Sequence, residues 1–435
     1  MKQNKVLFIG LVWPEPTSSA AGKRILQLVE FFLNRGDEVV FSSAASKTEW
    51  SFDFASMDSV AERRARRQAG SRSLPNLVKE IPIQLNHSSF NEFVRNLNPD
   101  IVVYDRFVSE EQFGWRVSQE CPNAVQILDT EDLHFLRSAR ETAYKKKEEI
   151  NLYNEIALRE IASVLRCDLS LIISEFEMNL LQNEFNIASS LLHYLPFTEN
   201  ANRWLKTAIE LSRNGTETTD FENRKDFAFI GNFLHEPNWQ TVLHLKKNIW
   251  PKIREKLPDA KLNIYGAYPS QKVWDLHNEK DGFWVHGKAD DALKVISKAR
   301  VLLAPIVYGA GQKGKFIDAM QAGTPIATTS AGSEAMFDEI IPGIVEDDEN
   351  QFVKRTTELY QNKETWKKAQ TTGLKILSEK FDKDLFEENF NQKIIHLQSE
   401  LEQHRNRNFI GQILKQNSNN YLKYMSLWIE EKNKS

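Results

Sequence analysis

The sequence contains very little cysteine. Of its 435 residues only two, Cys121 and Cys167, carry a thiol. Two thiols are too few for a disulfide framework, and they are too few for a thiolate metal site. The composition therefore excludes the small disulfide-stabilised domains and the cysteine-based zinc modules.

Long apolar runs and an excess of one charge are also missing. No stretch approaches the roughly 20 apolar residues of a membrane-spanning helix. The apolar run from Val6 to Val12 is too short for a signal-peptide core and ends at Trp-Pro-Glu-Pro. Basic residues number 56 against 60 acidic ones, a net charge of −4, whereas nucleic-acid binders are usually clearly basic. We expect a soluble, cytoplasmic protein that does not bind nucleic acid.

The length and the alternation of segments predict two α/β domains, because 435 residues exceed what one core needs. Apolar runs typical of buried parallel strands alternate with segments of helical spacing. In the first half we expect strands at 5–11, 37–44, 80–86, 100–107, 124–132, 167–175 and 189–197. In the second half we expect strands at 227–233, 260–268, 282–289, 299–309 and 324–330. The expected domains are 1–197 and 226–385, with a polar linker at 198–225 and C-terminal helices at 386–435.

One glycine-rich loop indicates a phosphate site. Residues 309–316 read Gly-Ala-Gly-Gln-Lys-Gly-Lys-Phe, between an expected strand and an expected helix. A Walker A loop would need Ser or Thr after Lys315 to hold magnesium, and Phe316 excludes that loop. Glycines admit an anion to main-chain N–H groups, and the helix start and two lysines add positive charge. The alternative is a close-packed turn carrying two solvated lysines.

The segments around this loop resemble a known family. The sequence from "FAFIGNFLHEPNW" through "LNIYGAY" and "GFWVHGKADD" to "GAGQKGKFIDAMQAGTPIATTSAGSEAM" resembles the donor half of the family-four retaining glycosyltransferases. The opening segment, residues 5–40, resembles that family's acceptor domain. The resemblance implies the GT-B fold, in which two Rossmann-like, doubly wound domains face a cleft and C-terminal helices cross back to the first domain. It also implies a nucleoside-diphosphate sugar as donor.

The resemblance assigns residues to the donor. Lys315 is given a catalytic role at the leaving diphosphate. Asp318 takes the place of the second Glu in the family's Glu-seven residues-Glu motif, which holds the donor's ribose, whereas Ala310 stands where the first Glu is expected. The donor-binding candidates are Gly22, Gly231, Asn232, Gly266, Gly309, Gly311, Lys313, Lys315, Asp318, Ser330, Gly332 and Glu334. No metal and no other cofactor is expected, since the only Asp-x-Asp string, at 382–384, reads as a helix start.

The first half is expected to bind the acceptor. His134, Arg137 and Arg140 follow an expected strand, at the end where doubly wound sheets place ligands, and could touch either donor phosphate or an acceptor hydroxyl. His134 is the catalytic candidate there, and Arg106, which also follows a strand, is an acceptor-side candidate. The alternative is that Arg137 and Arg140, three residues apart, share a helix face with nearby carboxylates and that His134 is an ordinary capped or surface residue.

Two further features have simpler interpretations. The basic cluster at 62–72 is typical of a solvated helix or loop, with contact to an anionic acceptor or a membrane surface as the alternative. At the C-terminus, five apolar residues recur at helical spacing, namely Tyr421, Tyr424, Met425, Trp428 and Ile429. We expect that stripe to pack against the protein, with a partner interface as the alternative.

The function predicted from these patterns is metal-independent, retaining transfer of a hexosyl-type sugar from a nucleotide-sugar to an unidentified acceptor, such as a glycan or a lipid-linked sugar. Two alternatives stay open. One is a GT-B nucleotide-sugar 2-epimerase, and the other is a non-catalytic nucleotide- or sugar-binding module.

Overall fold

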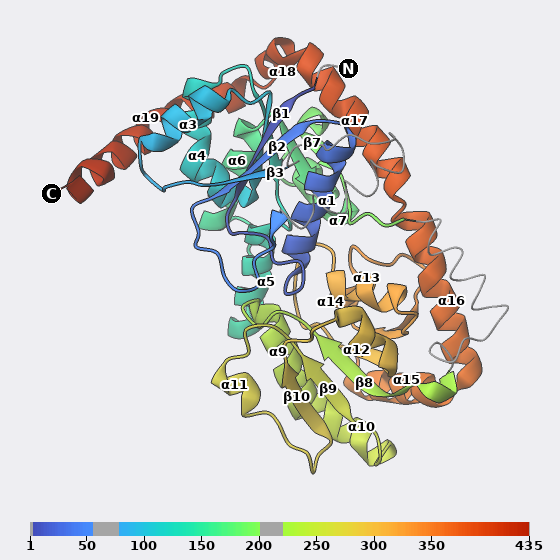
Figure 1. Ribbon diagram of the computed structural model, residues 1–435. Coiled ribbons are helices and arrows are strands. Elements are labelled where there is room, and N and C mark those ends of the chain that lie inside the picture. The colour runs from blue at the N-terminus through green and yellow to red at the C-terminus, as the bar shows by residue number, and fades with distance from the viewer. Residues whose placement is uncertain (1–2, 55–77, 201–220, 435) are drawn as a thin grey trace, which may run out of the picture.

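The computed structural model describes residues 3–54, 78–200 and 221–434. Its two halves each contain one parallel β-sheet, and the C-terminal helices run along one side of the molecule (Figure 1). The basic cluster predicted at 62–72 lies outside the described residues, as does most of the predicted linker.

The first sheet has seven strands in the order β3-β2-β1-β4-β5-β6-β7. They are β1 (Lys5–Gly10), β2 (Glu38–Ser43), β3 (Val78–Pro82), β4 (Ile101–Asp105), β5 (Val125–Asp129), β6 (Leu169–Ile172) and β7 (Leu192–Tyr194). Residues of β1 alternate between two apolar clusters, with Leu7 and Ile9 in one and Val6 and Phe8 in the other. Both faces of this sheet are therefore covered, as its continuous apolar strands require.

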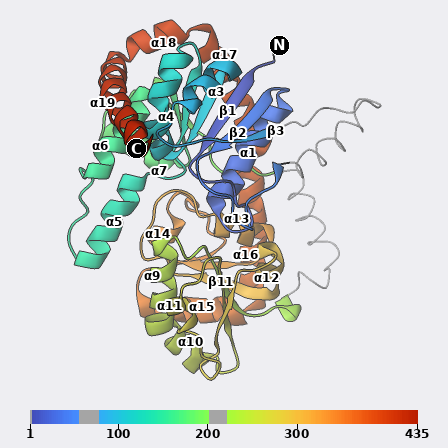
Figure 2. The same cartoon turned by 60° about the vertical axis from the view of Figure 1, so that its left-hand side comes forward.

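Six described helices belong to this half. They are α1 (Ala20–Asn34), α3 (Ser89–Leu97), α4 (Arg106–Glu120), α5 (His134–Lys146), α6 (Glu155–Arg166) and α7 (Glu175–Asn183). Figure 2 shows them on both sides of the sheet, with α5 extending toward the second half. Arg106, which the sequence predicts at the end of a strand, instead begins α4 with a φ of 67°.

The second sheet has six parallel strands in the order β10-β9-β8-β11-β12-β13. They are β8 (Lys225–Ile230), β9 (Leu262–Tyr265), β10 (Phe283–Gly287), β11 (Ala299–Ala304), β12 (Ile326–Thr328) and β13 (Gly343–Val345). The short strand β13 is absent from the sequence prediction. Its three residues have too little apolar pattern to reveal a strand, and pairing of Ile326 with Gly343 recruits it to the edge.

Helices surround the second sheet. They are α9 (Glu236–His244), α10 (Trp250–Lys256), α11 (Gln271–Trp274), α12 (Ala292–Lys298), α13 (Gly314–Gln321), α14 (Ser330–Ser333), α15 (Glu349–Gln361) and α16 (Lys363–Lys380). The segment 238–257 reads as one amphipathic helix in the sequence. In the structure a π-helical turn, Leu245–Ile249, separates α9 from α10, where Pro251 cannot donate a backbone hydrogen bond.

The chain crosses between the halves twice, and the two crossings lie together. The Glu199 N–H on the outward path donates to the Phe381 carbonyl on the return path over 2.6 Å. After Phe381 come α17 (Lys383–Ser399), α18 (Leu401–Arg407) and α19 (Phe409–Lys434). The Phe390 ring of α17 lies 4.7 Å from the Phe31 ring of α1, centroid to centroid. The C-terminal helices therefore extend the core of the first half.

The predicted packing of the C-terminal stripe is wrong. Four of its five residues, Tyr421, Tyr424, Met425 and Trp428, are exposed, and only Ile429 is half-buried. The opposite face of α19 lies on the protein instead, where Ser426 and Glu430 are buried by polar contacts. Helical spacing alone reveals a face, and it does not reveal which face meets the protein.

Candidate functional site

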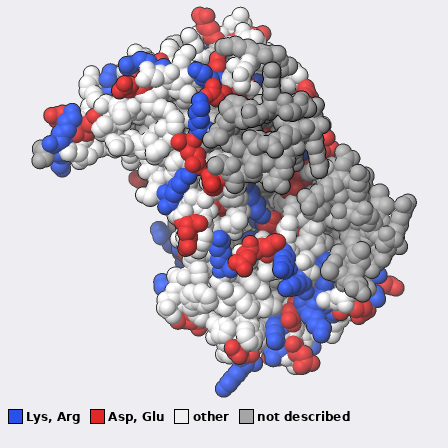
Figure 3. All heavy atoms as spheres, in the orientation of Figure 1, with Lys and Arg blue, Asp and Glu red and all other residues white. Residues whose placement is uncertain are grey.

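The glycine-rich loop joins β11 to α13 at the point where the two halves meet. Gly311 has a φ of 60°, a conformation that favours glycine, and its N–H donates to Glu177 Oε1 over 2.9 Å. A Cβ at Gly311 would lie only 2.7 Å from the Asp132 Cβ. The loop therefore contacts the first half closely. Figure 3 shows charged side chains of both signs gathered at this waist.

The two lysines of the loop lie beside it, and neither contacts a carboxylate directly in the part of the chain that the structure describes. Lys313 Nζ donates to the carbonyls of Gly311 and Glu334, over 2.8 and 3.2 Å. Lys315 Nζ donates to the neutral Asn238 Oδ1 over 2.6 Å and lies 4.3 Å from the centre of the Phe229 ring. The two ammonium groups are thus held by neutral partners.

Desolvation makes both lysines unusually weak bases. Burial, together with the neighbouring charge of Lys313, lowers the pKa of Lys315 to about 7. Burial lowers the pKa of Lys313 to about 8, although the charges of Glu334 and Glu177 oppose the shift. A buried cation without an anion is costly, and binding an anion offsets that cost. We call the junction between the two halves the cleft, since it lies where the resemblance implies one. The loop is the part of this junction that is best suited to hold negative charge.

Two ion pairs between the halves flank the lysines. Arg140 of α5 donates to both carboxylate oxygens of Glu334, over 2.6 and 2.9 Å, and to the Gly309 carbonyl over 2.6 Å. Asp318 accepts a hydrogen bond from Lys23 of α1 over 2.5 Å. The structure thus brings Arg140, an acceptor-side candidate, onto the donor loop, and it places an ammonium group on the carboxylate assigned to ribose.

The glycines at the strand ends are required by packing. A Cβ at Gly266 would lie 2.1 Å from the Gly231 carbonyl oxygen, and one at Gly231 would lie 2.7 Å from the Asn238 side chain. The Asn232 side chain accepts from the Leu234 N–H over 2.8 Å, which makes a local turn. These three candidates shape the wall behind Lys315, since Asn238 is the residue that Lys315 contacts.

The remaining donor-side candidates occupy helix starts. Gly22 lies in the first turn of α1, where a Cβ would meet the Glu15 backbone at 2.5 Å. The Ser330 N–H at the start of α14 donates to Asp347 over 2.9 Å. A Cβ at Gly332 would lie 2.0 Å from the Thr328 hydroxyl. These contacts explain the small residues by packing, and none of them by itself points to a ligand.

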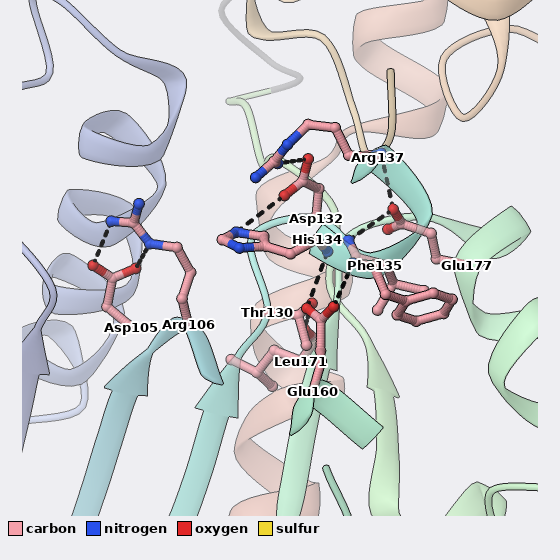
Figure 4. Close-up of polar contacts among 12 residues, drawn as sticks. Asp105, Arg106, Thr130, Asp132, His134, Phe135, Arg137, Glu160, Leu171 and Glu177 are labelled. Carbon is pink, nitrogen blue, oxygen red and sulfur yellow. Dashed lines mark hydrogen bonds and ion pairs between the residues drawn. The ribbon is translucent and has the colours of Figure 1, made fainter. Parts of the chain in front are cut away.

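His134 begins α5 on the other side of the cleft (Figure 4). The N–H groups of His134 and Phe135 donate to the buried Glu160 carboxyl over 3.1 and 2.8 Å. This helix start is therefore already occupied by an acid and does not offer its amides to phosphate. Burial lowers the pKa of His134 to about 4, although Asp132, 3.4 Å from its Nε2, opposes the shift. The ring is neutral at pH 7 and able to accept a proton.

The arginines of the first half are paired (Figure 4). Arg137 binds Asp132, and that positive charge lowers the pKa of Asp132 even though burial alone would raise it. Arg106 donates to both oxygens of Asp105 over 2.9 and 2.8 Å. The Arg137 pair agrees with the simpler interpretation of that residue, and Arg106 is paired in the same way. Arg140 instead pairs with Glu334 of the second half.

Three residues of the cleft escaped the sequence analysis. Asp132 is the last residue of the strand expected at 124–132, and a strand-end rule could have selected it. Glu177 has only the signal of a helix start, and burial raises its pKa to about 7. His235 is the residue immediately before α9. Burial together with the charge of Arg137 lowers the pKa of its imidazole to about 3. His235 belongs to the second half, but the charges of Arg137 and His134 in the first half both contribute to lowering its pKa.

The described residues contain no group of three or more His, Cys, Asp or Glu side chains that could hold a metal ion. Every helix in the described ranges is too short or too polar to traverse a membrane. A cavity of about 480 Å³ lies at the far edge of the first sheet, lined by Asn4, Arg35 and Asp100. Asn4 and Asp100 lie at the N-terminal ends of the central strands β1 and β4, away from the cleft.

Residues 224–362 match the family model described as "Glycosyl transferases group 1". The match covers the second sheet and its glycine-rich loop. No curated protein matches the chain.

Solved structures resemble the chain over most of its length. Anabaena HepE, in complex with UDP and glucose, has a TM-score of 0.61 at 11% identity, covering 90% of this chain and 99% of that one. Sucrose-phosphate synthase from Thermosynechococcus elongatus has a TM-score of 0.61 at 14% identity, covering 91% and 99%. A mutant of S. aureus TarM, in complex with UDP, has a TM-score of 0.54 at 12% identity. The chain spans 58% of that TarM structure, and the match covers 71% of this chain. The predicted GT-B fold is confirmed by these likenesses and by the two sheets.

Proposed function

We propose that this chain is a retaining glycosyltransferase that moves a sugar from a nucleoside-diphosphate sugar to an acceptor. One observation carries the proposal. Lys313 and Lys315 hold two poorly solvated ammonium groups, without a direct carboxylate partner in the described ranges, on a glycine-rich loop between two domains. The family match over residues 224–362 supports a glycosyltransferase, and the HepE structure with UDP and glucose supports a nucleotide-sugar as donor.

The chemistry follows from where charge develops. Breaking the sugar–diphosphate bond places negative charge on the leaving phosphate and positive character on the sugar ring. Ammonium groups held in place before the reaction stabilise that negative charge without reorganising. Lys315 is the principal candidate, since Asn238 fixes its Nζ while leaving its charge unbalanced. Metal independence is part of the proposal, because two lysines can supply the positive charge.

The backbone N–H groups of the loop, unlike the two lysines, are not all available to a phosphate. Gly311 N–H already donates to Glu177, so a phosphate can take that donor only when this bond breaks. Burial raises the pKa of Glu177 to about 7, and a protonated carboxyl accepts a hydrogen bond less strongly than a carboxylate. We therefore assign the first contact with phosphate to the lysines. The amides of Gly309 and Gly311 remain a second set of donors.

His134 is the proposed catalytic residue of the acceptor side. Its neutral imidazole can accept a proton from an acceptor hydroxyl, and the Asp132 carboxylate stabilises the imidazolium that forms. Arg140 reaches the donor loop from the same helix and would place the acceptor side against the donor. The acceptor we propose is a glycan or a lipid-linked sugar, and the proposed location is the cytoplasm.

A non-catalytic sugar- or nucleotide-binding module is the second candidate. Two observations favour it. Ala310 cannot make the sugar contact of the expected first Glu, and Asp318 is engaged by Lys23 rather than free for ribose. Such a module would bind a nucleotide-sugar through the same loop without turning it over.

Incubation with a panel of nucleotide-sugars tests the proposal. Free nucleoside diphosphate that appears only when an acceptor is added, with the donor's anomeric configuration kept in the product, supports retaining transfer. Epimerised donor without acceptor would identify a 2-epimerase. Binding without turnover would identify the binding module. A thermal-shift screen with uridine, guanosine, adenosine and thymidine diphosphates identifies the base, since a ligand at 100 times its dissociation constant adds about 2.7 kcal/mol of stability.

A further inference from the structure

Helix α19 presents its apolar side to solvent. Tyr421 is 70% exposed, Tyr424 69% and Trp428 63%. Five further large apolar side chains of this helix are exposed, namely Phe409, Ile410, Ile413, Met425 and Leu427. All eight fall in two groups, at 409–413 and 421–428, and monomeric soluble proteins rarely expose that many large apolar groups on one helix. We call these eight residues the α19 stripe.

The orientation of α19 is fixed by polar contacts on its other side. Arg116 of α4 donates to the Ser426 hydroxyl over 2.7 Å. The Ser88 hydroxyl donates to the Glu430 carboxylate over 2.6 Å, and the Ser88 N–H donates to the same oxygen over 3.1 Å. A Cβ at Gly411 would lie 2.1 Å from the Leu165 carbonyl oxygen, so that end of the helix lies directly on α6. The stripe is therefore held outward.

Geometry argues against a second copy of this chain as the cover. A helix of 26 residues is about 39 Å long. A stripe about 10 Å wide on such a helix offers about 400 Å² per copy, half of what a stable interface buries on each partner. Both Gln416 and Asn417 are exposed at the middle of the helix. These polar residues interrupt the continuous apolar interface that two paired helices would need.

Charge and residue type fit a lipid surface. The helix carries four lysines and two glutamates, although the whole chain has a net charge of −4. Glu430 is turned inward onto Ser88, and the exposed charged side chains of the described helix are Lys432, Lys434 and Glu431, with Lys434 paired to Glu431. The exposed charge is therefore positive by one. Figure 3 shows basic and acidic side chains together at the far end of α19, beside white surface. Tyrosine and tryptophan favour the headgroup region, and lysines are attracted to anionic lipids.

We infer that the α19 stripe is a docking surface for an anionic membrane, on which α19 lies parallel to the bilayer plane. The inference is independent of the proposed function, because it uses no residue of the cleft. It also differs from the membrane contact considered for residues 62–72, which lie outside the described residues.

Vesicle co-sedimentation of the full chain tests the inference. The unaltered protein is expected to sediment with vesicles of phosphatidylcholine and phosphatidylglycerol, and less with phosphatidylcholine alone. Changing both Tyr424→Gln and Trp428→Gln is expected to weaken binding by roughly tenfold or more, since each ring removes apolar burial. The matched control is Trp274→Gln, an exposed tryptophan of α11, which should bind as the unaltered protein does.

The outcomes separate the explanations. Failure of the unaltered protein to sediment overturns the inference, and so does equal sedimentation of the double variant. A dimer in light scattering that the double variant abolishes, without vesicle binding, would assign the stripe to a second copy and overturn it as well. If the double variant fails to fold, Lys432→Glu with Lys434→Glu replaces it. That variant keeps the stripe and should lose roughly fivefold in affinity for each lysine on anionic vesicles.

Discussion

The two sides of the cleft differ in whether their basic side chains are paired with carboxylates. On the side of the first half, the arginines are paired with carboxylates, as Arg106 is with Asp105 and Arg137 with Asp132. On the side of the second half, Lys315 contacts only an amide oxygen and an aromatic ring among the described residues. Ion pairs on the first side leave little charge for a ligand to neutralise. The second side retains positive charge that an incoming anion can neutralise.

This difference assigns the two sides to different partners. A nucleoside diphosphate brings two or more negative charges, and the lysines of the loop are suited to receive them. A sugar or lipid-linked hydroxyl is neutral, and it needs hydrogen-bonding groups such as a neutral imidazole. The cleft is thus expected to select donor on one side and activate acceptor on the other.

The largest effect is expected from Lys315→Met. Loss of the ammonium group removes charge stabilisation of the leaving phosphate, so kcat/KM should fall by about 10²- to 10³-fold. The affinity for UDP, measured by calorimetry, should fall with it. Lys247→Met, at an exposed lysine of the same half, is the matched control and should keep full activity.

Stability distinguishes loss of charge from loss of structure in this variant. A half-buried cation without an anion costs free energy of folding, so the ligand-free Lys315→Met protein should unfold at the same temperature or higher. Full turnover in Lys315→Met would remove the phosphate assignment.

The next largest effect is expected from His134→Asn. Removing the proton acceptor should lower kcat by about 10²-fold and leave UDP affinity unchanged, because the donor side is intact. Steady-state kinetics and calorimetry measure the two quantities separately. A parallel fall of UDP affinity would place His134 on the donor side and erase the contrast between the two sides.

The pH dependence of donor binding should show the weak basicity of Lys315. In the free protein its pKa is about 7, lowered by burial and by Lys313, so the amine loses its proton as pH rises through 7. Phosphate favours the ammonium form, so binding takes up a proton, and UDP affinity should fall by up to about tenfold per pH unit above 7. Calorimetry in buffers of different ionisation enthalpy measures the uptake. An uptake that persists in Lys315→Met would assign it to another group.

The smallest effect is expected from Lys145→Ala. Lys145 Nζ lies 2.9 Å from Glu236 across the rim of the cleft, but both side chains are exposed. Such pairs contribute about 0–1 kcal/mol, so kcat/KM and the unfolding temperature should hardly change. A tenfold loss of activity would show that the Lys145–Glu236 pair, and not the contacts of the glycine-rich loop, fixes the relative position of the two halves.

Local patterns were enough to predict much of the fold. The buried strands of both sheets are continuous apolar runs, and the glycine-rich loop has an unusual composition at a strand-to-helix junction. Lys313 and Lys315 could be selected for the same reason, since charge beside glycine at a helix start is visible in eight consecutive residues. In contrast, β13 depends on its pairing with β12, whereas the break between α9 and α10 has a local signal in Pro251.

Contacts between the halves could not be predicted in this way. Glu177 meets Gly311 across 134 positions of the chain, and Lys23 meets Asp318 across 295. No periodicity records such a pairing, because it exists only once both domains have folded and docked. The direction of the α19 stripe has the same origin, since Arg116 and Ser88 decide which side of that helix is buried.

The sequence by itself determined the two α/β domains, the phosphate-type loop and the absence of a Walker A hydroxyl, because each depends on residues that are adjacent in the chain. The tertiary structure decided which charges are neutralised and which are left for a ligand. It gave Arg137 and Arg106 to carboxylates of the first half, and it set Lys315 against neutral groups. The physical reason is that desolvation and ion pairing depend on distances in space, which a linear pattern does not contain.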